Sequence, residues 1–149
     1  MTFESIDALK TYIISRCGDA IQKAQEEVYQ IIDRFVKEYY AEFSPTMYER
    51  TYQLYKSLVK SDIKSTGNGY VAEVYFDIGM LDYYMKKING KEYPNKGWSE
   101  EKTLTAAAHG SHGGYTSGTA IWDEPLQILN TEAYNMLKRM LISSGIPLR

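Results

Sequence analysis

The feature that most constrains the fold is a series of apolar residues at helical spacing in the first part of the chain. From Ser5 onward they recur every three or four positions as far as Tyr39, which is the period of an α-helix. The series consists of Ile6, Leu9, Ile13, Cys17, Ala20 or Ile21, Ala24, Val28, Ile31 or Ile32, Phe35 and Tyr39. It predicts a long amphipathic helix with Ser5 as its N-cap. Gly18 leaves open a bend or a division into two helices, and Ser44-Pro45 marks the expected end.

The length of this helix limits how the rest of the chain can pack around it. A helix continuing to about Tyr40 would be about 50 Å long at 1.5 Å per residue. That is longer than a compact domain of 149 residues can fully cover. Since a chain of this length is expected to form one domain, we predict a single domain over residues 1–149. We also expect part of the apolar stripe to meet another chain.

A β-hairpin is predicted in the middle of the chain. Val59–Lys64 and Tyr70–Asp77 have strand-like sequences, and they flank Gly67-Asn68-Gly69. The two glycines readily supply the positive φ angles of a tight hairpin loop. Apolar and more polar positions alternate in the second strand, so the face that carries Val74 and Phe76 is expected to meet the core.

The segments on either side of the hairpin are less regular. Tyr48–Leu58 fits either a short helix or an extended lead into the first strand. Leu81–Ile88 predicts a short amphipathic turn or helix, closed by Asn89-Gly90. Residues 91–118 are interrupted by Gly, Ser, Thr, Asn and Pro, and they predict a long variable loop. We expect this loop to be mobile in the free protein and to become ordered on assembly.

The C-terminal part regains helical spacing. Trp122-Asp123-Glu124-Pro125 predicts a helix start, Thr131 allows a second start, and Gly145 with Pro147 predicts the end. The expected apolar stripe consists of Leu126, Leu129, Ala133, Leu137, Met140 and Leu141. The predicted fold class is therefore α+β. It comprises a long N-terminal amphipathic helix (1–43), a central antiparallel β-hairpin or small sheet (44–90), the long loop (91–118) and a C-terminal helical segment (119–149).

Charge and hydropathy exclude several classes of partner. The net charge is −2 and the pI is about 5.7, so the chain lacks the basic surface that nucleic-acid binding requires. No run of about 18 apolar residues is present to span a membrane, and no secretory signal is recognised. The only cysteine, Cys17, fits a buried apolar role in a reducing compartment. We expect an intracellular protein with no membrane and no specific nucleic-acid partner.

The chain is rich in tyrosine, with 14 Tyr against 4 Phe and 2 Trp. Tyrosine joins a large apolar face to a polar tip, so it suits both half-buried packing and protein interfaces. The sequence leaves these two uses open for any one tyrosine. The residues predicted to form an interface are Tyr48, Arg50, Tyr52, Tyr55, Trp98 and Trp122.

The strongest hint of catalysis is the pair His109 and His112, because two imidazoles can share a zinc ion when further ligands complete the site. The pair lies among glycines, no cysteine is near, and the glutamate of the helical zinc-protease motif is missing. Ser111 lies between the two histidines without a nucleophile-elbow motif. We therefore predict no catalytic residues, no cofactor and no metal, and keep His109 and His112 as weak metal-site candidates.

A resemblance suggests a role. The first predicted helix ends in Tyr39-Tyr40 before Pro45, and Tyr48-Glu49-Arg50-Thr51-Tyr52-Gln53-Leu54 follows with the pattern Tyr-x-Arg-Thr-x-x-Leu. Towards the C-terminus, Gly118-Thr119 precedes Pro125. In these motifs the chain resembles small structural proteins from phage and prophage morphogenesis clusters of Gram-positive bacteria. It is most similar to the tail-completion or head–tail joining family.

This resemblance implies a non-enzymatic subunit that forms a homo-oligomeric ring at the head–tail junction. The implied partners are further copies of the chain and the portal, connector or tail proteins of the phage. The implied location is the host cytoplasm during assembly and then the virion. Two alternatives remain. One is a small metal-dependent hydrolase that uses His109 and His112, and the other is a tyrosine-rich peptide- or carbohydrate-binding module.

Overall fold

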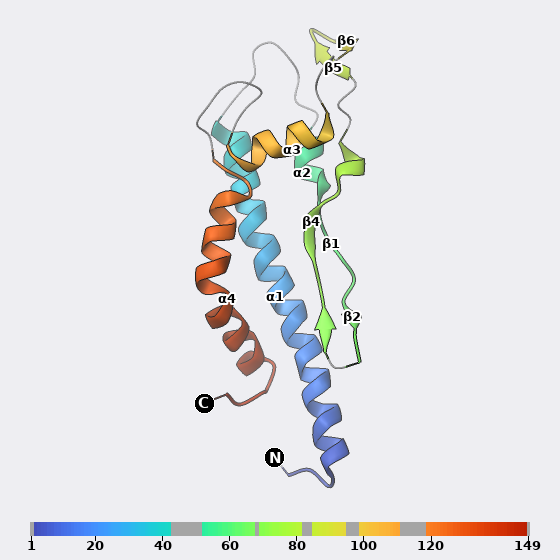
Figure 1. The fold of residues 1–149 in the computed structure, drawn as a ribbon, viewed down its shortest axis with the longest axis vertical. Helices are drawn as coiled ribbons and strands as arrows, with labels where there is room; N and C mark the ends of the chain where they lie inside the picture. The colour runs from blue at the N-terminus through green and yellow to red at the C-terminus, as the bar shows by residue number, and fades with distance from the viewer. Residues whose placement is uncertain are drawn as a thin grey trace. The chain divides into compact units, whose positions relative to one another are not determined.

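The structure is a computed structural model, and it describes residues 2–42, 52–67, 69–81, 85–94, 99–110 and 119–148. Its elements are α1 (Ile6–Glu42), α2 (Gln53–Ser57), β1 (Leu58–Lys60), β2 (Lys64–Ser65), β3 (Tyr70–Val71), β4 (Val74–Phe76), the 3-10 helix η1 (Ile78–Met80), β5 (Met85–Ile88), β6 (Lys91–Pro94), α3 (Glu100–Ala108) and α4 (Asp123–Ser143) (Figure 1). A long N-terminal helix, small antiparallel sheets and a C-terminal helix confirm the α+β prediction.

Helix α1 is a single element of 37 residues. Ser5 is its N-cap, as predicted, because the Ser5 Oγ accepts a hydrogen bond from the Ala8 amide at 3.1 Å. The helix continues through Gly18, so the alternative of two separate helices is wrong. Packing explains the glycine at this position. A Cβ there would lie 3.1 Å from Cζ of Tyr70, so the lack of a Cβ lets the Tyr70 ring approach the helix backbone.

The predicted hairpin forms, although its ladder is interrupted. β1 pairs with β4, and β2 pairs antiparallel with β3 in the register Lys64↔Val71 and Ser65↔Tyr70. Between these pairs, the Ser61 amide donates to the Glu73 carbonyl at 2.9 Å. The Glu73 amide donates to the Ser61 Oγ, also at 2.9 Å. A side-chain oxygen thus replaces a backbone acceptor, which explains why two short strand pairs form where one longer pair is predicted.

A second hairpin corrects the prediction for Leu81–Ile88. β5 pairs antiparallel with β6, and Ile88 lies opposite Lys91. The two residues between them, Asn89 and Gly90, have φ values of 49° and 76°. Positive φ at both positions is the geometry of a two-residue hairpin turn, and Asn-Gly is its favoured sequence. The pair therefore turns one strand into the next and does not close a helix.

The prediction of a loop over residues 91–118 is also wrong in part, because β6 and α3 lie within it. Ser99 caps α3, since its Oγ accepts from the Lys102 amide at 3.2 Å. Glu100 and Glu101 occupy the first turn, where the helix dipole favours acidic side chains. A cap followed by acidic residues is itself a helix-start signal. Residues 95–98 and 111–118 lie outside the described residues.

Contacts along the chain divide it into two compact units, and the prediction of a single domain stays a prediction. Unit 1 comprises Met1–Val28, Lys60–Val74 and Leu129–Arg149. In it, the first part of α1 lies between the β2–β3 hairpin and the last turns of α4 (Figure 1). On the hairpin side, the Gln25 side-chain amide donates to the carbonyls of Ser61 and Glu73 at 2.8 and 2.9 Å.

On the α4 side of unit 1, the helices run antiparallel. Arg139 pairs with Glu27 at 2.7 Å, and the Tyr12 hydroxyl donates to the carbonyl of Gly145 at 3.2 Å. Later residues of α4 thus meet earlier residues of α1. The buried apolar residues of this unit include Ala20 and Met136.

Unit 2 comprises Tyr29–Val59 and Tyr75–Ile128. The buried apolar residues of this unit come from several of its elements and from the residues just before α4. They include Ile32, Phe35, Val36, Leu54, Leu58, Leu81, Ala107, Ala120 and Ile121. The Ile121 amide donates to the Ala107 carbonyl at 3.1 Å. The carboxylate of Glu42 accepts from the Thr119 amide at 2.6 Å and from its hydroxyl at 2.5 Å. These bonds tie the start of the α4 segment to the end of α1 and to the end of α3.

Helix α4 begins at Asp123, as predicted, and continues through Thr131, so Thr131 starts no second helix. It ends at Ser143, and Gly145, two residues later, has a φ of 92°. The Gly145 amide donates to the Ile142 carbonyl, and the Ile146 amide donates to the Leu141 carbonyl, both at 3.0 Å. This is the Schellman motif, in which a left-handed residue satisfies the last helical carbonyls.

Only one edge of the predicted α4 stripe is covered. Leu126, Ala133 and Leu137 are exposed, whereas Leu129, Met140 and Leu141 are half-buried. The fully or almost fully buried residues of the helix are Pro125 and Met136, which were not in the predicted stripe. The apolar face of α4 is therefore wider than the surface that covers it, and part of it remains available for another contact.

We predict that Gly145→Ala destabilises the fold more than Gly67→Ala. Both glycines have positive φ, which costs an alanine about 1 kcal/mol. A Cβ at Gly145 would also lie 3.0 Å from the Tyr12 hydroxyl, whereas a Cβ at Gly67 would meet nothing within 4 Å. The crowding should cost about 1 kcal/mol more. Urea unfolding of both variants measures the difference, and adding Tyr12→Phe to Gly145→Ala should recover part of it. Equal losses for the two variants would mean that the Tyr12 contact carries no strain.

Candidate protein-binding surfaces

The described residues include four of the eight candidate residues, namely Tyr52, Tyr55, His109 and Trp122, and all four belong to unit 2. The other four, Tyr48, Arg50, Trp98 and His112, lie outside the described residues. The four described candidates fall into two groups. One is a cluster of tyrosines at the end of α1, and the other is a pocket beside Trp122.

The tyrosine cluster joins the end of α1 to α2. The ring of Tyr40 stacks on Tyr52, with centroids 5.1 Å apart, and meets Tyr55 edge-on at 6.5 Å. Tyr52 has a φ of 56°, which is uncommon for a residue other than glycine. Tyr52 and Tyr55 therefore take part in packing within the chain. Tyr52 is still 49% exposed, so one of its faces remains accessible to a partner.

A charged pair borders this cluster. The Lys37 ammonium lies 2.6 Å from the carboxylate of Asp33 and 6.0 Å from the ring centre of Tyr55. The hydrogen bond to Asp33 and the charge of that carboxylate raise the pKa of Lys37. Asp33 is buried, although the sequence places it on the polar face of α1. A buried carboxylate needs a partner, and Lys37, one turn later, provides it while remaining exposed.

Trp122 forms one wall of a pocket of about 360 Å³. The residue immediately precedes α4, and its ring lies edge-on to Phe76 of β4 with centroids 6.3 Å apart. The pocket is lined by Tyr75, Phe76, Leu104, Thr105, Ala108, His109, Trp122 and Asp123. Most of these side chains are apolar, and the Trp122 and Tyr75 side chains remain partly exposed at its edge. A concave apolar surface with a few polar groups is typical of a site that accepts a ligand or a partner's side chain.

The polar end of the pocket is the pair His109 and Asp123. The His109 Nδ1 lies 2.6 Å from the Asp123 Oδ2, although His109 ends α3 and Asp123 begins α4. In this contact Nδ1 donates and the carboxylate accepts. Both side chains are largely exposed, so this pair contributes little to stability. The pair gives the pocket a negative edge next to its apolar wall.

The structure provides no further support for a metal site at His109. Among the described residues, no group of three His, Cys, Asp or Glu side chains could hold a metal ion. His112 lies outside them. In the described contacts, no serine, threonine or cysteine is hydrogen-bonded to the imidazole of His109. A nucleophilic site would need such a residue beside the imidazole. Within the part of the chain that the structure describes, no third group joins His109 and Asp123.

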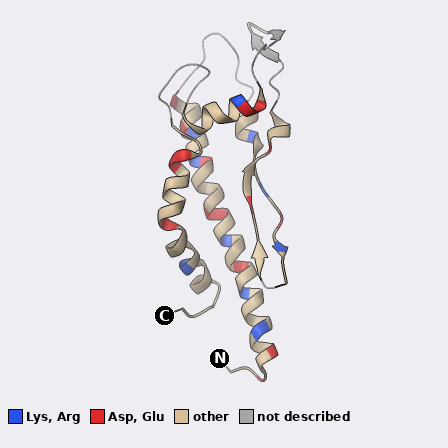
Figure 2. Ribbon diagram, in the orientation of Figure 1, with Lys and Arg blue, Asp and Glu red and all other residues tan. Residues whose placement is uncertain are grey.

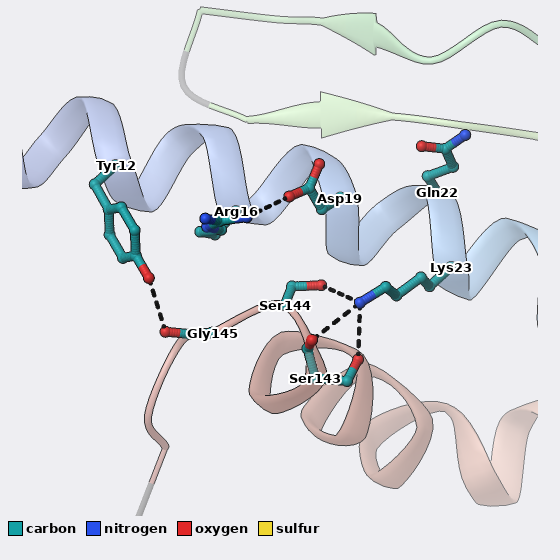
Figure 3. Close-up of a pocket in the computed structure, with 8 residues that line it drawn as sticks. All are labelled: Tyr12, Arg16, Asp19, Gln22, Lys23, Ser143, Ser144 and Gly145. Carbon is teal, nitrogen blue, oxygen red and sulfur yellow. Dashed lines mark hydrogen bonds and ion pairs between the residues drawn. The ribbon is translucent and has the colours of Figure 1, made fainter.

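Unit 1 contains a second, polar pocket of about 400 Å³ (Figure 3). Figure 3 shows Lys23 of α1 reaching the end of α4, where its ammonium donates to the Ser143 carbonyl and hydroxyl and to the Ser144 hydroxyl at 3.0 to 3.2 Å. A cation at this place stabilises the negative end of the helix dipole. Arg16 is 3.1 Å from Asp19, and this hydrogen bond raises the pKa of Arg16. The basic groups of this pocket thus hold the protein's own structure.

The N-terminal turns of α1 carry the most exposed part of the stripe. Ile6 is 84% exposed, and Leu9 and Ile13 are each about 40% exposed. The prediction that part of the stripe meets another chain stays a prediction, and these three side chains are its exposed apolar part among the described residues. None of the described helices is long and apolar enough to cross a membrane.

Comparison with known proteins gives one match. A family model described as YomN matches residues 5–143, which is nearly the whole chain. Its name is that of a Bacillus phage or prophage-like gene and indicates a phage-related protein. No curated protein and no solved structure matches the chain.

We predict that replacing His109 with alanine leaves the folded structure intact and changes the free energy of unfolding by less than about 1 kcal/mol, because its pair with Asp123 is exposed. Thermal unfolding of the wild type and of His109→Ala tests this. Metal analysis of the same samples addresses the alternative. Zinc bound one to one in the wild type, and lost together with stability in the variant, would establish a metal site that the prediction excludes.

Proposed function

The chain belongs to the YomN family, and we propose from this that it is a structural subunit of a phage or prophage particle. In the proposal it acts in tail completion or head–tail connection, by oligomeric protein–protein assembly and without catalysis. Its partners would be further copies of the chain and the portal, connector or tail proteins of the same phage. It would be present in the host cytoplasm during assembly and afterwards in the virion.

The observation that carries the proposal is the uncovered apolar surface at Ile6, Leu9 and Ile13. A free energy of roughly 25 cal/mol per Å² of apolar surface removed from water favours covering such a stripe, and the described residues leave Ile6 84% exposed. Further exposed apolar residues lie on α4, where Tyr134 is 75% exposed. Several separate apolar surfaces on one small chain suit a subunit with more than one neighbour.

The distribution of charge supports a protein partner over a nucleic acid. Acidic and basic residues are interspersed along α1, and the start of α4 is acidic (Figure 2). No described element therefore carries a continuous basic face of the kind that phosphate binding requires. Mixed charge around apolar surface is instead typical of protein interfaces, in which charges at the edge select the partner.

We predict that deleting the gene from the phage or prophage that encodes this chain blocks the formation of infectious particles. Electron microscopy of the lysate should show heads and tails that are not joined or tails that are not completed. Expression of the wild-type chain from a plasmid should restore infectivity. A matched plasmid that encodes Ile6→Asp and Ile13→Asp should fail to do so, because two charges in the stripe would prevent its burial.

Mass spectrometry of purified particles provides the second measurement. The chain should be present in several copies per particle. Normal infectivity of the deletion strain, with particles that lack the chain, would contradict the proposed function. Restoration by the Ile6→Asp, Ile13→Asp variant would instead show that the chain acts through another surface.

A further inference from the structure

The Trp122 pocket is apolar and open, and its edge is acidic. Asp123 contributes one carboxylate to its lining. Glu101 precedes Leu104 and Thr105 by three and four residues on α3 and therefore lies on the same helix face as these two lining residues. An occupant that suits this site would carry aliphatic side chains for the walls and a cation for the edge.

The first turns of α1 carry that combination of groups. Ile6, Leu9 and Ile13 follow the i, i+3, i+7 spacing of one helix face. By the same geometry, Lys10 lies along one side of this face and Arg16 along the other. All three apolar side chains are exposed. Arg16 already pairs with Asp19, so the face is an apolar stripe with the cation of Lys10 at one side. It complements the pocket in both hydropathy and charge.

We propose that the Ile6, Leu9 and Ile13 stripe of one copy of the chain docks in the Trp122 pocket of a second copy. Ile and Leu side chains meet Phe76, Leu104 and Trp122. Lys10 approaches the carboxylate of Asp123, whose Oδ2 also lies 2.6 Å from His109 Nδ1. Docking of an amphipathic helix in an apolar groove is a common mode of protein recognition. This inference rests on the proposed function, in which the chain assembles with itself.

The contact is head-to-tail, because the stripe and the pocket are different surfaces. After one copy has docked, its own pocket and the stripe of its neighbour are still open. Contacts of this type continue from copy to copy until the rotation closes a ring, or they extend into a filament. A closed ring agrees with the proposed role at a head–tail junction.

A mixing experiment tests this contact. Ile13→Asp places a charge in the stripe and prevents its burial. Thr105→Arg fills the pocket with a long side chain, and because Thr105 is an exposed residue of α3, the core is unchanged. Each variant alone should be monomeric in size-exclusion chromatography with light scattering, whereas the wild type should form a larger oligomer. A one-to-one mixture of the variants should form a dimer and nothing larger. One intact stripe then meets one intact pocket, and no further contact is possible.

Two additional variants make the test specific. Val71→Asp places the same charge on an exposed apolar residue of β3, outside the stripe and the pocket, and should leave the oligomer unchanged. Lys10→Glu should weaken association about tenfold or more through repulsion by Asp123. If the copy that contributes the pocket carries Asp123→Lys, its association with the Lys10→Glu stripe should be restored. Circular dichroism confirms the fold of each variant, and Trp122→Ala serves as a second pocket variant.

The outcomes separate this inference from the proposed function. If the wild type is monomeric at every concentration, or if the variants associate as the wild type does, the stripe does not dock in the pocket. If Ile13→Asp prevents association but mixing yields no dimer, the stripe pairs with another surface, and the inference is again overturned. The deletion experiment decides independently whether the chain is needed for the particle.

Discussion

The structure depends on the need to cover one long helix with segments that come from distant parts of the sequence. The 37 residues of α1 contribute to both compact units, and each unit covers a different part of the stripe. In unit 1 the cover is the β2–β3 hairpin and the end of α4. In unit 2 it is α2 and residues 119–122, which immediately precede α4. The first turns, around Ile6, are left without cover among the described residues.

Long polar side chains align these covering segments with α1. Gln25 donates to two carbonyls of the hairpin, Lys23 donates to the last residues of α4, and Glu42 accepts two hydrogen bonds from Thr119. Each such bond contributes only about 0.5–1.5 kcal/mol net, so burial of apolar residues such as Ala20 and Ile32 is still required. The polar contacts define the register of the covering segments, because most of the groups that they bind are backbone atoms at fixed positions of those segments.

The same arrangement supports the proposal that the chain assembles with other subunits. Covering α1 uses only one edge of the apolar face of α4, and it leaves the Trp122 pocket open between α3 and the start of α4. The surfaces that remain differ from one another: a convex stripe with the cation of Lys10 at one side, a concave pocket with an acidic edge, and the α4 face around Tyr134. When the complementary surfaces of one chain are different, contacts that continue from subunit to subunit are favoured, and a closed two-fold dimer is not.

The sequence alone determined the features that depend on near neighbours. The Ser5 cap, the helical period of α1, the first hairpin and the stop marked by Gly145 each require only residues a few positions apart. Tertiary structure decided which edge of α4 is buried, why Gly18 is tolerated, that Asp33 lies inside, and that Phe76 and Trp122 form one pocket. These outcomes depend on residues far apart in the chain. A periodic pattern specifies that a helix has an apolar face, but the segment that covers this face is fixed only when the chain has folded around it.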